Sequence, residues 1–179
     1  PYSFMVQSNK SEMRPFVSFP LGEGLTGTLE MAAARDVYAM SSEDYGEKEL
    51  RSILKWKGEE DKALSFYMFS RWKDYDERLQ RNRYGFSMDS TSETRTVGSG
   101  INASRNLGKE DDWEVSLSGH VHKTTDNAGG YYDYTSLNGN LKLSHKIGQW
   151  TLSANLRASH SEYDIRKTSA DELFKRNGF

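Results

Sequence analysis

The chain has 179 residues, of which 35% are hydrophobic and 28% are charged, with a net charge of -2 and no cysteine. This length suits a single domain. A charge near zero without a run of Lys or Arg excludes nucleic acid as a partner, and the lack of cysteine excludes disulfides and cysteine-bound metals. No run of about 18 apolar residues is present for a transmembrane helix. Because the sequence begins at Pro1 without a Met, we expect a processed protein or a piece of a longer one.

Residues 1–24 form a poorly patterned N-terminal segment. Two short apolar runs, at residues 2–6 and 13–19, predict short strands. Pro15 interrupts the second run and Pro20 closes it. Proline cannot donate to a ladder hydrogen bond, so these strands are expected at the edge of a sheet or leading into a loop.

Alternation begins beyond this segment. Residues 25–31 switch regularly between apolar and polar side chains. The alanines that follow leave a helix over residues 29–40 open, but the alternation and the lack of an N-cap favour a strand. Residues 50–56 alternate in the same way, and residues 62–72 form the most hydrophobic strand that we predict.

A highly charged stretch follows at residues 73–83. Such charge density indicates a solvated loop that leaves the sheet, with the alternative that strand persists at the two ends of this stretch. Beyond it we expect two strands, at residues 84–88 and 95–105. The polar residues 89–94 would form the turn between them.

The C-terminal half contains three long alternating segments, at residues 113–122, 135–144 and 150–158. In the first, odd positions carry Trp, Val, Leu, Gly and Val, whereas even positions carry Glu, Ser, Ser, His and His. A period of two predicts strands with one apolar and one polar face. Short turns between such strands predict an antiparallel meander.

Aromatic residues fall at the ends of these strands. If successive strands alternate in direction, Trp72, Trp113 and Trp150 lie at one end, and Trp56 lies at the other with a tyrosine cluster. Aromatic levels at both ends of apolar strands are typical of membrane-spanning barrels. The predicted membrane-interface aromatics are Trp56, Trp72, Trp113, Tyr131, Tyr132, Tyr134 and Trp150.

Given these features, residues 62–166 resemble a bacterial outer-membrane β-barrel. The resemblance rests on the alternation of apolar with Ser, Asn, Thr and Gly residues, on the aromatic levels and on the hairpin Gly129-Gly130-Tyr131-Tyr132. It implies one domain over residues 1–179. The implied fold is all-β, an up-and-down antiparallel meander of about 8 to 10 strands that forms a β-barrel or part of one. A looser similarity is to the barrel domains that follow helical-repeat regions in outer-membrane export and lipoprotein-display proteins.

The resemblance also implies a location and a role. We expect the chain in the bacterial outer membrane, in contact with the lipid bilayer, as an anchor, a channel or a scaffold. Polar faces of its strands would line a lumen. The lumen-facing candidates are Glu114, Ser116, Ser118, His120, His122, Asn138, Asn140, Asn155 and Arg157.

The polar face of residues 113–122 could carry chemistry. His120 and His122 have the spacing of a metal-binding His-x-His pair, and a serine, a histidine and a carboxylate could form a hydrolase. The sequence offers no orienting third group and no strained nucleophile turn. Ordinary lumen filling is therefore favoured, and we expect no catalytic residue, no metal and no cofactor.

Two alternatives remain open. A soluble, lipocalin-like ligand-binding β-barrel, secreted or periplasmic, alternates identically but turns its apolar face inward. An outer-membrane lipid hydrolase would use the serine and histidine groups. Periodicity does not show which face is outward, but the aromatic levels and the small residues on the polar faces favour the membrane barrel.

The ends of the chain predict an incomplete barrel. The strand at residues 150–165 is long, whereas the N-terminal candidates are short, so they are a poor match for closing a ring. We expect further strands or a partner subunit to pair with residues 150–165. The sequence ends on Phe179, but residues 167–179 lack alternation and are expected to form a polar or helical tail.

Overall fold

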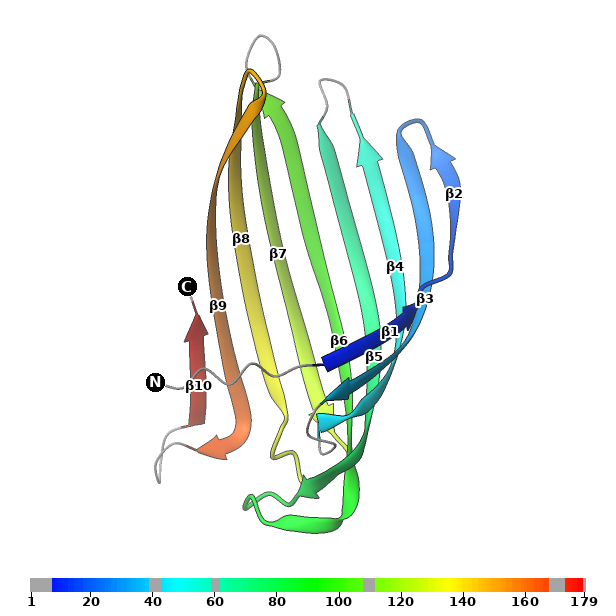
Figure 1. Ribbon diagram of the computed structural model, residues 1–179, viewed down its shortest axis with the longest axis vertical. Helices are drawn as coiled ribbons and strands as arrows, with labels where there is room; N and C mark the ends of the chain where they lie inside the picture. The colour runs from blue at the N-terminus through cyan, green and yellow to red at the C-terminus, as the bar shows by residue number, and fades with distance from the viewer. Residues whose placement is uncertain (1–7, 39–42, 59–61, 108–111, 168–172, 179) are drawn as a thin grey trace.

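The computed structural model describes residues 8–38, 43–58, 62–107, 112–167 and 173–178. They form a single ten-stranded antiparallel sheet (Figure 1). This confirms the all-β meander and the predicted number of strands. The strands are β1 (Ser8–Met13), β2 (Phe16–Gly22), β3 (Leu25–Tyr38), β4 (Tyr45–Lys57), β5 (Ala63–Arg81), β6 (Ser87–Leu107), β7 (Trp113–Asp126), β8 (Tyr134–Ile147), β9 (Trp150–Lys167) and β10 (Leu173–Gly178).

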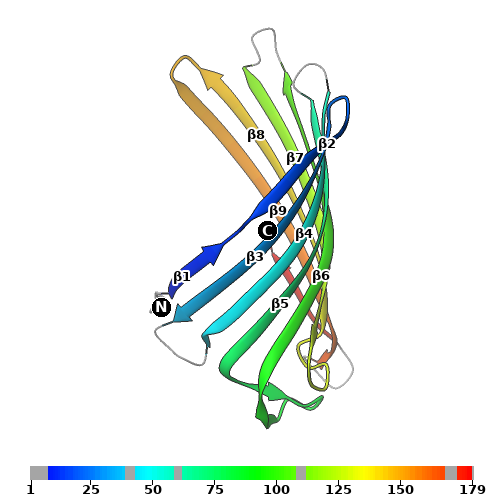
Figure 2. The same ribbon diagram turned by 90° about the vertical axis from the view of Figure 1, so that its right-hand side faces the viewer.

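The sheet is an up-and-down meander that curves without closing. From β3 to β10, each strand pairs with its neighbours in sequence. At the N-terminal edge, β2 pairs with residues 25–30 of β3 and β1 pairs with residues 33–38. Figure 2 shows the sheet twisting into an open trough. In the described part of the chain, β1 and β2 lie at one edge of the sheet and β10 lies at the other.

The long strands β5 and β6 correct the prediction for residues 73–94. β5 continues to Arg81 instead of leaving the sheet at residue 73, and β6 runs unbroken through the expected turn at 89–94. The real turn lies at residues 82–86. There the Asn82 Oδ1 atom accepts backbone N–H bonds from Tyr84 at 2.9 Å and Phe86 at 3.1 Å, and Gly85 has a φ of 85°. An asparagine and a glycine set this turn because they satisfy and permit its backbone geometry.

Because no turn is present at residues 89–94, Trp72 lies at a different end of the sheet from the one predicted. Through Arg95 of β6, Trp72 is in register with Thr125 of β7. Thr124, the residue before Thr125 on β7, pairs with Tyr134 of β8. Trp72 therefore lies at the end of the sheet that carries residues 127–133, the connection between β7 and β8 that we name the tyrosine hairpin, drawn at the bottom of Figure 1.

Trp56 also lies at the end of the sheet opposite to the predicted one, for the same reason. It pairs with Leu64 of β5, beside the hairpin that joins β4 to β5, at the same end as Trp113 and Trp150. The predicted levels of Trp56 and Trp72 are thus wrong. Each is found at the opposite end, because an extra turn in the prediction reversed the direction of every strand before it. Both ends of the sheet still carry aromatic side chains.

Both terminal regions contain strands. The proline-containing run gives the edge strand β2, as predicted, whereas residues 2–6 lie outside the described residues. Leu25–Tyr38 is a strand, so the helical alternative for residues 29–40 is wrong as far as residue 38, where this part of the description ends. A helical form of the tail is also wrong where the tail is described: Leu173–Gly178 forms β10, which pairs with residues 159–167 of β9.

Burial is inverted relative to a water-soluble core. Among the described residues, Tyr45 is the one buried hydrophobic side chain. Large apolar side chains of β3 to β9 are exposed on one face of the sheet, with Leu117 57% and Leu156 67% exposed. The buried side chains are instead polar or charged, namely Thr28, Asp36, Glu47, Glu49, Gln80, Ser92, Thr124, Ser136 and Ser144.

Candidate functional site

A cluster of polar side chains lies on the concave face of the sheet. It surrounds a cavity of about 460 Å³ that reaches from Arg51 on β4 to Tyr163 on β9. Four cationic side chains line it, and we name it the cationic cavity: Arg51, Arg71, Lys73 and Arg78. Six aromatic rings also line it: Tyr67, Phe69, Tyr75, Tyr132, Tyr134 and Tyr163.

Glycines on β6 make room for two of these rings. A Cβ atom on Gly98 would come within 2.8 Å of the Phe69 ring and 2.7 Å of the Cβ atom of His122. Gly100 faces the Tyr67 ring in the same way. Only a residue without a side chain lets the two rings lie flat against β6, so these glycines shape the wall of the cavity.

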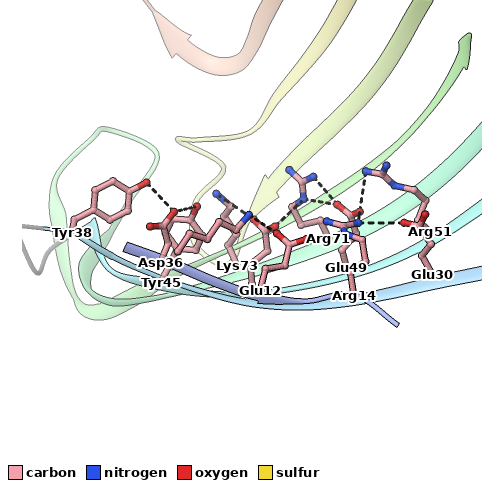
Figure 3. Close-up of polar contacts among 12 residues, drawn as sticks. Glu12, Arg14, Glu30, Asp36, Tyr38, Tyr45, Glu49, Arg51, Arg71 and Lys73 are labelled. Carbon is pink, nitrogen blue, oxygen red and sulfur yellow. Dashed lines mark hydrogen bonds and ion pairs between the residues drawn. The ribbon is translucent and has the colours of Figure 1, made fainter. Parts of the chain in front are cut away.

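Behind the cations, Glu49 is the centre of a charge network (Figure 3). Arg71 donates to its Oε2 atom from Nε at 2.8 Å and from Nη2 at 2.6 Å. Arg51 Nη2 lies 2.9 Å from Oε1, and Arg14 Nη1 donates to Oε1 at 3.2 Å. The Glu49 side chain is only 1% exposed. Three guanidinium groups thus compensate one buried carboxylate, which would be costly to bury alone.

Glu47, two residues before Glu49 and on the same face of β4, has a similar role. Its carboxylate lies 3.5 Å from Lys73 Nζ and 3.6 Å from Arg71 Nε. The Lys73 ammonium also lies 3.8 Å from the centre of the Tyr45 ring, a cation–π contact. The carboxylates are therefore set into the sheet, while the cations lie between them and the cavity.

Aromatic rings fix the guanidinium groups on the cavity side. Arg51 lies over the rings of Tyr67 at 5.6 Å and Phe69 at 5.9 Å, and Arg71 also lies over Phe69 at 5.6 Å. A cation–π contact of this kind holds a guanidinium against a ring without using its N–H groups, which stay available for oxygen atoms.

Histidines of β7 form the opposite wall. The rings of His120 and His122 stack with centres 5.6 Å apart, and His122 meets Tyr134 edge-on at 5.8 Å. His122 Nδ1 is buried and has no hydrogen-bond partner among the described residues. Buried polar atoms are usually hydrogen-bonded, so this nitrogen is a polar group of the wall that no described residue satisfies.

The remaining predicted lumen residues lie on the same concave side in two further cavities. Glu114, Ser116 and Ser118 line one of about 670 Å³ near Trp56. Asn138, Asn140 and Arg157 line another of about 480 Å³, together with Ser118 and His120. Asn155 pairs with Lys142 of β8 in the register.

The predicted chemical groups of β7 do not combine into one site. Ser116 Oγ donates to Glu114 at 3.3 Å, whereas His120 stacks on His122. These contacts form two separate pairs, and neither joins a serine hydroxyl to an imidazole. Within the described ranges, no group of three or more His, Asp or Glu side chains is placed to hold a metal ion.

At one rim of the sheet, the hairpin between β7 and β8 is held by Asp126. Its Oδ1 atom accepts the backbone N–H of Ala128 and Gly130, each at 3.0 Å, and its Oδ2 atom accepts that of Tyr132 at 2.9 Å. Asp133 Oδ1 accepts the Asp126 N–H at 2.7 Å. The hairpin is therefore a fixed structure and not a loose loop.

The rim aromatics contact arginines from other elements. Arg78 lies 4.9 Å from the ring centre of Tyr132, and Arg166 lies 5.4 Å from that of Tyr131. Burial, with the charges of Asp126 and Asp164, raises the pKa of Asp133 above its ordinary value, although the Asp126 N–H bond lowers it.

The charge network of β4 and β5 was missed at the sequence level. Its signal was present: Glu47 opposes Lys73, and Glu49 opposes Arg71, as cross-strand pairs of opposite charge. Because residues 73–83 were assigned to a loop, Lys73 had no partner strand and the pairs could not be recognised.

Comparisons with protein-family models, curated proteins and solved structures found no match for this chain. In the part of the chain that the structure describes, no helix is long and apolar enough to cross a membrane.

Proposed function

We propose that this chain forms the wall of a bacterial outer-membrane β-barrel and serves there as an anchor, a channel or a scaffold. The observation that carries the proposal is the inverted burial of the sheet. Leucine, isoleucine, phenylalanine and tryptophan side chains cover the exposed face, while the concave face holds charge networks. A polar interior and an apolar exterior are typical of barrels in lipid.

The exposed apolar surface is continuous across strands. Leu117, Leu141 and Leu156 occupy one level of the register from β7 to β9. Monomeric soluble proteins rarely expose a contiguous apolar patch larger than roughly a few hundred Å². Each Å² of such surface removed from water stabilises by about 25 cal/mol, so lipid contact would be strongly favoured.

The strand lengths fit a bilayer. β7 and β8 each have 14 residues and β9 has 18. A tilted strand needs about 9–11 residues to cross the hydrocarbon layer. Trp113 and Trp150 at one end, and Trp72 and the tyrosine hairpin at the other, would then lie near the two interfaces.

The same inversion weighs against a soluble lipocalin-like barrel. That alternative requires the apolar face to line the concave side. Here the concave side carries Glu47, Glu49, Arg71 and Lys73. The geometry of β7 provides no observation that favours a lipid hydrolase.

We extend the proposal to a missing neighbour of β9. Among the described residues, β10 covers residues 159–167 of β9, which leaves residues 150–158 paired with β8 alone. Unpaired backbone groups in hydrocarbon cost several kcal/mol each. Further strands or a partner subunit would cover this edge in the membrane.

Vesicle binding tests the proposed function. The chain, purified in detergent, is diluted into buffer with or without phospholipid vesicles whose acyl chains carry bromine. We expect it to float with the vesicles, with bromine quenching its tryptophan fluorescence, and to aggregate without lipid or detergent. A chain that stays monodisperse in buffer alone and does not float with vesicles would overturn the proposal.

A further inference from the structure

The cationic cavity is lined by positively charged side chains without a carboxylate among its described lining residues. Arg51, Arg71, Lys73 and Arg78 line it, and none of its described lining residues is Asp or Glu. The compensating carboxylates belong to the strands behind: Glu47 and Glu49 contact the cations but do not line the cavity. Positive groups are therefore presented to whatever enters.

Arg71 is held in one orientation. Its Nε and Nη2 atoms both bond Glu49, and its guanidinium lies over the Phe69 ring. These contacts leave Nη1 outside the Glu49 bonds. A guanidinium fixed by a carboxylate on one edge and by a neighbouring ring is pre-organised for a second oxyanion, because little side-chain entropy remains to be lost on binding.

Arg78 approaches the cavity from the rim. It lies 4.9 Å from the ring centres of both Tyr75 and Tyr132, and its nearest carboxylate, Glu43, is 3.7 Å away and half exposed. An ion pair at 3.7 Å to a half-exposed carboxylate is weak and leaves most of the Arg78 charge available. Two arginines thus face the cavity from different strand levels.

A row of rings lies beside these charges. His122 meets Tyr134 edge-on at 5.8 Å, and Tyr134 lies 5.2 Å from Tyr163 with a tilt of 35°. Thr96 and Thr124 share a hydrogen bond of 2.9 Å on the same wall. A ligand with a flat body next to its charged group would contact both the rings and the cations.

The geometry points to a binding site for a small ring-bearing oxyanion, a carboxylate or a phosphate attached to an aromatic ring. Both anions accept two parallel bonds from a guanidinium edge. The cavity volume of about 460 Å³ lies within the range of about 300–1,000 Å³ for small-molecule sites. This site is assigned from the concave face alone and does not rest on the proposed membrane location.

Calorimetric titration of the detergent-solubilised chain tests the assignment. The probes are benzoate, phenyl phosphate, inorganic phosphate and the neutral benzyl alcohol. We expect saturable one-to-one binding of benzoate or phenyl phosphate, weaker binding of inorganic phosphate and none of benzyl alcohol. Which ring-bearing probe binds more tightly tells a carboxylate site from a phosphate site. Absence of saturable binding for both overturns the assignment, and inorganic phosphate binding as tightly as phenyl phosphate overturns the role of the rings.

Two variants locate the site. Arg78→Gln should weaken binding about tenfold, since one charge-assisted hydrogen bond is lost. Thr96→Asp places a carboxylate in the cavity wall and should abolish binding. Ser116→Asp is the matched control, because it adds the same charge on the concave face but in the cavity near Trp56. Equal losses in Ser116→Asp and Thr96→Asp would overturn the site. Thermal melting identifies folded variants, and either of the two cavity variants suffices for the test.

Discussion

Leu117 of β7 lies directly opposite Leu141 of β8 on the exposed face of the sheet. The next residues along the two strands, Ser118 and Asn140, also oppose each other, but they line the concave side. One step along either strand therefore changes an apolar, exposed position into a polar, interior one. This pairing offers a direct test of which face meets lipid.

We expect Leu117→Arg and Leu141→Arg to impair membrane assembly, each by about 2–4 kcal/mol, the cost of Arg near the bilayer midplane. Ser118→Arg and Asn140→Arg should be tolerated because their positions stay wet. The measurement is the free energy of unfolding in vesicles, by urea titration. Equal effects at all four positions would reject the assignment of the two faces.

The second prediction concerns Glu49, which contacts three guanidinium groups while its side chain is 1% exposed. Glu49→Gln leaves those cations without their shared carboxylate, and breaking such a buried network costs about 3–5 kcal/mol. Chemical denaturation in detergent measures the loss. Glu12→Gln, which removes an exposed carboxylate paired to Lys10 and Arg14, is the control and should change stability far less.

Most of the strands that sequence reasoning found have two faces that differ in polarity. From Trp113 to His122, every apolar residue is on one face and every polar residue on the other, and this segment lies within β7. The alternation depends only on neighbouring residues, so it is visible without knowing any strand pairing.

The ends of β5 and β6 could not be found in this way. Both faces there are polar, and the residues that hold them together meet only across the pair: Ser90 Oγ donates to Gln80 Oε1 at 2.8 Å, and Ser92 is 2% exposed. From the sequence alone, polar residues in a buried, paired strand cannot be distinguished from those of a loop. The cationic cavity could not be predicted either, because its lining residues come together only through the register of β4, β5 and β6.

Gly98 gives a packing prediction, and Gly139 serves as its matched control. A Cβ on Gly98 would come within 2.8 Å of the Phe69 ring, whereas a Cβ on Gly139 meets nothing within 4 Å. Gly98→Ala should destabilise by about 1–3 kcal/mol, as overpacking does. Gly139→Ala should be neutral or slightly stabilising, because it reduces the entropy of the unfolded chain. Urea titration of both variants checks the difference, and a loss at Gly139 equal to that at Gly98 would contradict it.

Asp133 gives the tyrosine hairpin a pH dependence. Its folded-state pKa is raised, so the hairpin is most stable below the ordinary pKa of Asp and loses that stability as pH rises through the raised pKa. Asp133→Asn keeps the oxygen that accepts the Asp126 N–H but removes the charge. We expect the variant to lose this pH dependence and to protect residues 127–132 from hydrogen exchange at neutral pH better than Asp133 does. Unchanged pH dependence would show that another group is responsible.

The free side of β9 gives the last prediction. Along an antiparallel strand, the backbone N–H groups of successive residues point alternately to the neighbour on each side. Residues 150–158 pair with β8 on one side and have no described partner on the other.

Residue-resolved hydrogen exchange of the isolated chain in micelles should therefore show every second amide of residues 150–158 exchanging fast. Residues 115–121 of β7, which pair with β6 and β8, are the internal control and should all exchange slowly. Where further strands or a partner subunit cover β9, the fast set becomes slow while the β7 pattern stays unchanged. Uniformly slow exchange along residues 150–158 in a chain that is monomeric in micelles would mean that this chain covers the edge itself, and no further strand would be needed.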